Sequence, residues 1–151
     1  MVAPRHRVFF DTSVYIAALL SPEGGAGELV RLAEAGALTL VVSEKIVVEA
    51  DQVLGKRFPD LIQESRRLWE ILAPEITPDP PPKAVAPFLR RLPASDAAIL
   101  CSAHLARVSA FVTWNTRDFM KPGIEPLVSF PIVVPGDCLK LFRKWITPFL
   151  E

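Results

Sequence analysis

Short apolar runs alternate along this chain with longer segments in which apolar residues recur at helical spacing. Strands are predicted for RVFF (7–10), LTLVVS (38–43), part of SAFVTWN (109–115) and FPIVV (130–134). Helices are predicted over 13–20, 26–36, 44–56 and 60–72, within 93–108, and from Pro135 toward Trp145. Because helices separate the strands, we expect a three-layer α/β fold with a mostly parallel central sheet.

Turn-forming and capping residues mark several of the predicted boundaries. Gly24 and Gly25 predict a turn after the first helix, and Gly36 predicts the end of the second. Ser43 and Ser95 each stand where a helix is expected to begin.

Residues 74–87 hold six of the 15 prolines of the chain. Such a segment cannot be regular structure throughout, because proline lacks a backbone N–H and fixes φ. Neither flank is long enough for a core of its own. We therefore interpret the segment as a stiff connection within a single domain spanning 1–151.

The composition favours a folded protein without membrane-spanning helices. The chain has 151 residues, of which 50% are hydrophobic, and can bury a sizeable core. No strongly apolar stretch reaches the roughly 18 residues that span a bilayer, and Asp11 interrupts the N-terminal stretch that faintly resembles a signal peptide. We expect a cytoplasmic protein in which Cys101 and Cys138 are buried free thiols.

Charge is balanced, with 17 basic and 17 acidic residues, so the molecule as a whole has no field that attracts nucleic acid. Any contact with a polyanion must therefore be local. Basic doublets occur at Lys56-Arg57, Arg66-Arg67, Arg90-Arg91 and Arg143-Lys144. Such doublets are more often solvated helix faces than phosphate contacts.

Four acidic residues are predicted to meet at one edge of the sheet. Asp11 directly follows the first strand, and Asp118 comes shortly after the strand that ends near Thr113. Asp96 lies in the first turn of its helix on the side facing the sheet, and Glu49 lies at the margin of a buried helix stripe. Ligands of such folds bind along the edge where strands end and the following helices begin.

Each acid also has an ordinary explanation. Asp11 could cap a helix, and Asp96 could be an acid favoured by the helix dipole. Glu49 could be a boundary residue with its carboxylate in water, and Asp118 could form a turn with its own backbone. None of these explanations accounts for all four acids sharing an edge.

Crowded carboxylates repel one another unless a cation cancels their charge. Oxygen ligands suit Mg²⁺ or Mn²⁺, whereas zinc would normally require His or Cys, and His6 and His104 lie in unrelated places. An ion held in this way can activate water and stabilise a leaving oxygen. Phosphodiester hydrolysis is the predicted reaction.

Other mechanisms fit the sequence less well. A Ser-His-Asp triad lacks a suitably placed histidine, and no G-x-S-x-G motif is present. The glycine-rich segment 24–27 follows a helix and matches no nucleotide-binding pattern. A response-regulator receiver would need two consecutive acids after the first strand and a lysine after the last.

Four segments together resemble a known family. VFFDTSVYIAAL, VVSEKIVVEADQVL, SDAAILCSAHLARVSAFVTWNTRDF and IVVPGDCL are similar, in this order, to the motifs of PIN-domain nucleases, including VapC-like toxins. The resemblance extends from residue 8 to about residue 140. It implies a Rossmann-like α/β/α fold and metal-dependent cleavage of single-stranded or structured RNA.

The resemblance also assigns roles to the four acids. Asp11 and Asp96 match the two principal metal ligands of the family. Glu49 matches the glutamate that binds the metal or orients its water. Asp118 matches the last acid, which acts through water or at a second metal.

Four further positions match the family's polar residues near the substrate. Asn115 stands where many members have another aspartate, which leaves open whether one or two ions bind. Thr12, Ser13 and Thr113 resemble small hydroxyl residues near the phosphate.

The resemblance implies an endoribonuclease that is the toxin of a toxin–antitoxin pair. An antitoxin would then insert a peptide across an apolar groove near the N-terminal helices and reach the acids with a basic side chain. The alternatives are a free-standing PIN-domain nuclease in RNA processing and a non-catalytic RNA-binding or scaffold domain. A homodimer is also expected, with the helices between 44 and 72 as candidates for its contact.

Overall fold

We describe residues 5–150 from a computed structural model of the chain. The strands are β1 (Arg7–Phe10), β2 (Thr39–Ser43), β3 (Glu75–Thr77), β4 (Ala110–Val112) and β5 (Ile132–Val133). The helices are α1 (Thr12–Leu20), α2 (Gly25–Glu34), α3 (Glu44–Arg57), α4 (Ile62–Leu72), α5 (Pro82–Leu89), α6 (Ala94–Ala106), α7 (Thr116–Phe119) and α8 (Pro135–Ile146). Short 3₁₀ turns cover Pro59–Leu61, Glu125–Leu127 and Thr147–Phe149.

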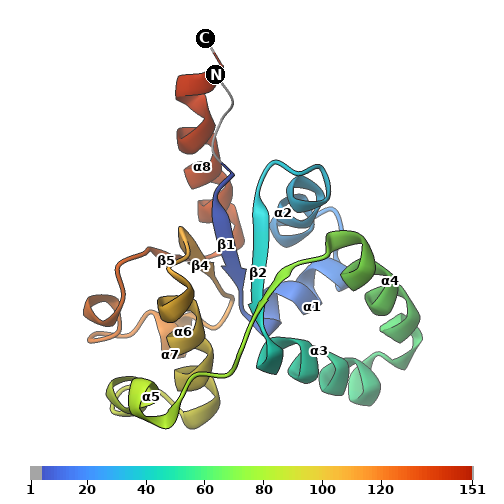
Figure 1. The fold of residues 1–151 in the computed structure, drawn as a ribbon. Coiled ribbons are helices and arrows are strands. Elements are labelled where there is room, and N and C mark those ends of the chain that lie inside the picture. The colour runs from blue at the N-terminus through green and yellow to red at the C-terminus, as the bar shows by residue number, and fades with distance from the viewer. Residues whose placement is uncertain (1–4, 151) are drawn as a thin grey trace.

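The five strands form one parallel sheet in the order β3-β2-β1-β4-β5. Phe9 of β1 pairs with Val41 of β2 on one side and with Phe111 of β4 on the other. Helices α1 and α2 lie on one side of the strands and α5 and α6 on the other (Figure 1). The predicted three-layer α/β/α fold is therefore confirmed.

The strand order has a switch point between β1 and β4. The chain moves outward from β1 through β2 to β3, and then returns to the other side of β1 for β4 and β5. In folds of this kind, ligands bind at the carboxyl ends of the two strands beside the switch point. Asp11 and Thr113 directly follow β1 and β4, so the topology places both residues at these strand ends.

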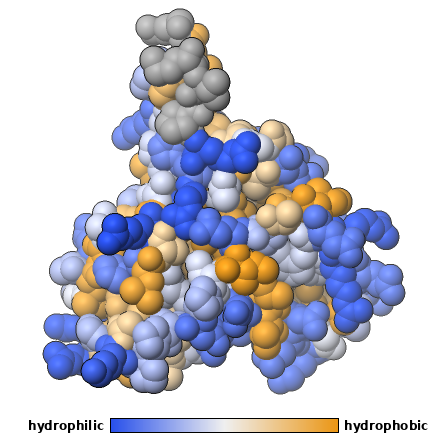
Figure 2. Space-filling view, viewed as in Figure 1, coloured by the Kyte–Doolittle hydropathy of each residue, from blue (hydrophilic) through white to orange (hydrophobic). Residues whose placement is uncertain are grey.

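Both faces of the central strands are buried, which explains why their sequences are apolar without alternation. Val8, Phe9 and Phe10 of β1 are completely buried, and the Phe9 ring stacks on Phe111 with a centroid distance of 5.4 Å. On the face seen in Figure 2, hydrophilic residues surround separate apolar patches. The helices thus enclose the core and leave a mixed surface outside it.

Two predicted boundaries agree with the structure and one is wrong. Ser43 begins α3, because its hydroxyl accepts a hydrogen bond of 3.3 Å from the Ile46 N–H. Gly36 follows the end of α2 with φ +78°, a conformation that favours glycine. Ser95 does not begin α6, since this helix starts at Ala94 and its first turn has no side-chain cap.

The prediction for the two glycines after α1 needs a correction. Gly24 is the non-helical residue before α2, but Gly25 already belongs to the helix. Gly27 lies so close to Pro22 that a Cβ there would meet the Pro22 carbonyl oxygen at 2.0 Å. The close approach of α2 to the preceding turn therefore depends on a glycine at this position.

The proline-rich segment contains more structure than the sequence indicates. It includes β3, which pairs with β2 through Val42 and Ile76, and most of α5, which begins at Pro82. A three-residue strand is too short for a periodic pattern. Proline is tolerated in the first turn of a helix, where its N–H would have no partner.

Both cysteines, Cys101 and Cys138, are buried free thiols, as predicted. Burial raises the pKa of the Cys138 thiol to about 12. None of the helices described within 5–150 is long and apolar enough to cross a membrane.

Candidate active site

Asp11 lies at the carboxyl ends of β1 and β4, where its N–H donates to the Val112 carbonyl, and is 6% exposed. Its Oδ1 accepts a hydrogen bond of 2.8 Å from the Thr12 N–H, so it caps α1, which is the ordinary role considered above. Its Oδ2 accepts hydrogen bonds of 3.0 Å from the Ser13 hydroxyl and 2.8 Å from the Thr113 hydroxyl. These donors come from α1 and from the end of β4, and they hold the carboxylate in one orientation.

Glu49 joins three helices at the same edge. Its Oε2 accepts a hydrogen bond of 2.9 Å from the Thr12 hydroxyl at the start of α1. Its Oε1 accepts one of 2.5 Å from the Ser95 hydroxyl in the first turn of α6. The side chain is half-buried, in agreement with its predicted place at the margin of the buried stripe of α3.

Ser95 is therefore a further residue of the candidate site, although its position in the sequence predicts a helix cap. The only available signal was its position directly before Asp96, on the same turn of α6. A serine at the start of a helix is so often a cap that this signal was not specific.

Asp96 and Asp118 meet at Asn115, which follows β4. The Asn115 side-chain N–H₂ donates a hydrogen bond of 3.1 Å to Asp118 Oδ2 and lies 3.5 Å from Asp96 Oδ2. Its Oδ1 accepts a hydrogen bond of 3.3 Å from the Asp118 N–H and thereby caps α7. In this turn the amide accepts the backbone hydrogen bond, which frees the Asp118 carboxylate to face Asp96.

The pKa values of Asp96 and Asp11 reflect their burial and the nearby carboxylates. Burial raises the pKa of Asp96 to about 6, together with the negative charges of Asp11, Asp118 and Glu49 and a hydrogen bond with Asp118. Burial also raises the pKa of Asp11, although its three hydrogen bonds oppose this effect. Among residues 5–150, no salt bridge ties any of the four acids to a basic side chain. The cluster therefore carries uncompensated negative charge.

The chemistry of these donors fits a hard divalent cation better than any other group. All four are carboxylates, and each one in the cluster makes ionisation of Asp96 less favourable. In the part of the chain that is described, however, no three acidic, His or Cys side chains are already arranged to hold one ion. Hydroxyl groups donate to the oxygens of Asp11 and Glu49, but each carboxylate oxygen has a second lone pair that could bind a cation.

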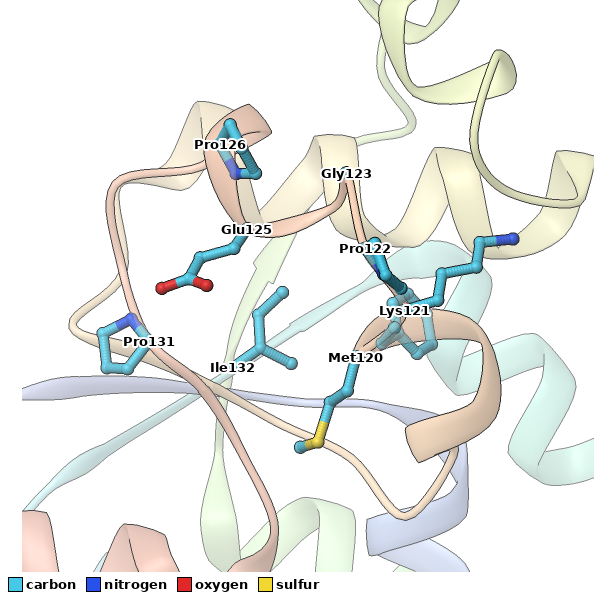
Figure 3. A pocket seen from close by; sticks show the side chains of 9 residues that line it. Met120, Lys121, Pro122, Gly123, Glu125, Pro126, Pro131 and Ile132 are labelled. Carbon is cyan, nitrogen blue, oxygen red and sulfur yellow. The ribbon is translucent and has the colours of Figure 1, made fainter.

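A separate cavity of about 490 Å³ opens beyond α7, next to β5 (Figure 3). Met120, Lys121 and Glu125 line it together with several prolines and Ile132. None of the four acids belongs to its lining. The cavity and the acidic cluster are therefore distinct features.

Fold and site together define a class: a three-layer α/β protein with a parallel sheet and an acidic cluster at its switch point. The family model for the PIN domain matches residues 7–117, which is most of the chain. The chain therefore belongs to the PIN-domain family, whose members are generally nucleases that bind divalent metals. A search of curated proteins found no match.

Solved structures with the same fold come from several sources. VapBC2 from Rickettsia felis, bound to a DNA fragment from its promoter, superposes with a TM-score of 0.60 at 14% identity over 84% of this chain and 98% of that chain. PAE2754 from Pyrobaculum aerophilum superposes with a TM-score of 0.58 at 19% identity, over 94% of this chain and 98% of that chain. FitAB bound to the IR36 DNA fragment superposes with a TM-score of 0.58 at 16% identity, over 85% of this chain and 94% of that chain. At these identities the likeness shows a common fold.

Proposed function

We propose that this protein is a Mg²⁺- or Mn²⁺-dependent endoribonuclease. The observation that carries the proposal is the meeting of four carboxylates from separate segments at one edge of the sheet, where no salt bridge within 5–150 neutralises them. The pKa of Asp96, which burial and the neighbouring carboxylates raise to about 6, agrees with this crowding. A fold that holds such a cluster without basic partners loses stability unless a cation binds there. Membership in a family of metal-binding nucleases supports the same conclusion.

In this proposal Asp11 and Asp96 are the principal metal ligands, and Glu49 and Asp118 bind the metal or its water. The bound ion would lower the pKa of a water molecule and stabilise the leaving oxygen of the phosphodiester. The chain's own contribution is to orient the carboxylates and to keep them free of basic side chains.

The hydroxyl groups of Thr12, Ser13 and Thr113 donate hydrogen bonds to the carboxylates. Thr12 donates to Glu49, whereas Ser13 and Thr113 donate to Asp11. We therefore extend their proposed role near the phosphate: they also fix the acids that would hold the ion. Asn115 has the corresponding position between Asp96 and Asp118.

We further propose that the protein is the toxin of a toxin–antitoxin pair acting on RNA in the cytoplasm. The VapBC2 and FitAB structures, which share its fold, are those of complexes bound to DNA. A hollow of about 130 Å³ between α1, α2 and α4 supports the proposed antitoxin groove. The hollow is lined by apolar residues that include Leu19, Val30 and Leu68, and by the charged side chains of Arg31, Glu34 and Glu64.

A free-standing nuclease in RNA processing is the alternative. The neighbouring reading frame distinguishes the two, because a toxin requires an adjacent gene for a small DNA-binding protein. A homodimer through α3 and α4 is also proposed, since Val48 and Ile71 on these helices are 54% and 59% exposed. We retain the proposal that 1–151 forms a single domain.

A cleavage assay on a panel of cellular RNAs, with Mn²⁺, Mg²⁺ or EDTA, tests the activity. We expect cleavage that requires the metal and is abolished by Asp11→Asn and by Asp96→Asn. Asp51→Asn is the matched control, because Asp51 is an exposed acid on α3 and its change removes the same charge. Cleavage that survives EDTA, or that either site variant retains, would refute the proposal.

A further inference from the structure

Trp114 is an exposed aromatic side chain between residues of the acidic cluster. Its side chain is 50% exposed, although it directly follows the completely buried Thr113. The other two tryptophans are half-buried and stacked: Trp69 on Tyr15 at 3.9 Å and Trp145 on His6 at 4.2 Å. Among the ring pairs within 5–150, none includes Trp114.

The backbone of Trp114 is fixed to the site on both sides. Its N–H donates a hydrogen bond of 3.1 Å to the Ser13 hydroxyl, which itself donates to Asp11. On one side the Thr113 hydroxyl donates to Asp11, and on the other Asn115 contacts Asp118. The acids and the backbone of Trp114 are thus held in one hydrogen-bond network, while half of the residue's surface is exposed to solvent.

Half of the Trp114 surface remains exposed to water, which is unfavourable for an apolar ring, and no aromatic ring within 5–150 stacks on it. The residues on either side of Trp114 contact Asp11 and Asp118, so a nucleotide chain whose phosphate lies at the acids is close to this residue. Every unpaired base offers a π-face for stacking, and one such contact contributes about 5- to 150-fold in affinity. A paired base is already stacked within its duplex and gains little.

We propose that the Trp114 indole is a stacking platform for an unpaired base of RNA and makes the site selective for single-stranded substrate. This inference rests on the proposed ribonuclease function and adds a substrate-positioning residue to it. The sequence alone gave no reason to select Trp114, because its exposure is decided by the packing around β4 and α7.

RNA binding is measured with the Asp96→Asn protein, so that the RNA is not cleaved during the measurement. The probes are a single-stranded oligouridine of about ten nucleotides and a duplex of the same length. Adding Trp114→Ala should weaken binding of the single strand by about 5- to 150-fold and leave duplex binding unchanged. Trp114→Phe should retain most of the affinity, because phenylalanine keeps an aromatic face.

Fluorescence adds a readout that a purely structural role would not change. The single strand should quench the emission of the Asp96→Asn protein, and Trp114→Phe should remove this quenching although Trp69 and Trp145 are still present. Met120→Ala is the matched control, since Met120 is 41% exposed at the far end of α7. It should alter neither affinity nor quenching.

The outcomes separate this proposal from the proposed activity. The stacking role would be overturned if Trp114→Ala bound the single strand as tightly as the Asp96→Asn protein, or lost affinity equally for single strand and duplex. Absence of quenching, or failure of the Asp96→Asn protein to bind RNA, would also overturn it. An equal loss in Met120→Ala would also overturn it. If binding and quenching behave as expected but the unmodified chain cleaves no RNA with Mn²⁺, the nuclease proposal fails and the stacking platform stands.

Discussion

Replacing Asp96 with asparagine should stabilise the metal-free protein, and the gain should depend on pH. Folding raises the pKa of this carboxyl from its ordinary value of 3.8 to about 6, because of burial and the nearby charges of Asp11, Asp118 and Glu49. Between these two pH values the folded chain holds a proton that the unfolded chain has released. Stability of the unmodified protein therefore falls as the pH rises from about 4 through 6, and then levels off.

The difference between 3.8 and about 6 corresponds to about 3 kcal/mol of stability lost at pH 8. Solvent reaches part of the Asp96 side chain and screens its interactions, so we reduce the expected value to about 1–2 kcal/mol. An amide has nearly the same shape and carries no charge. Asp96→Asn should therefore raise the free energy of unfolding by this amount at pH 8, or the melting temperature by about 2–8 °C.

Urea unfolding in EDTA at pH 4 and pH 8 measures this effect. At pH 4 Asp96 is largely protonated in the fold, so the variant should gain little there. Asp51→Asn, which removes an exposed charge from α3, should change stability by no more than about 0.5 kcal/mol at either pH. A variant at position 96 that is no more stable at pH 8, or equally stabilised at both pH values, would show that the four carboxylates do not crowd one another.

Two further substitutions test the framework around the site. Thr113→Val removes a buried hydroxyl that donates to Asp11 at 2.8 Å and accepts from the Asn115 N–H at 2.9 Å. The change should lower the free energy of unfolding in urea by about 1–3 kcal/mol and slow RNA cleavage. Thr113→Ser keeps the hydroxyl and should retain both the stability and the cleavage rate. Gly27→Ala places a Cβ 2.0 Å from the Pro22 carbonyl oxygen and should cost about 1–3 kcal/mol. Its control is Gly55→Ala, where a Cβ meets nothing within 4 Å and should stabilise α3 by about 0.5–1 kcal/mol; a similar thermal shift for both alanine variants would contradict this packing argument.

The elements that the sequence predicted well are those with a long periodic pattern or a clear boundary. Helix α3 runs from Glu44 to Arg57 after the Ser43 cap, close to the predicted 44–56. Strand β3, helix α5 and the single turn of α7 were not predicted, because each is short or lies among prolines. In β3 only three residues pair, and tertiary contact with β2 supplies the reason for the strand.

The sequence by itself determined the edge of the sheet at which the four acids gather. Alternating strands and helices require a parallel sheet, and a parallel sheet brings the ends of all its strands to one side. The positions of Asp11, Asp96, Glu49 and Asp118 relative to their own strands and helices then follow from chain order. This reasoning uses only local periodicity and topology, both of which are written in the order of the residues.

Only the tertiary structure decided which groups touch. Ser95 donates to Glu49 instead of capping its own helix, and Trp114 is exposed beside a buried Thr113. The pKa of Asp96 likewise depends on distances to three carboxylates from other segments. Hydrogen bonds and Coulomb interactions change over a few ångströms, and these separations are set by how helices pack across the sheet, which no local pattern encodes.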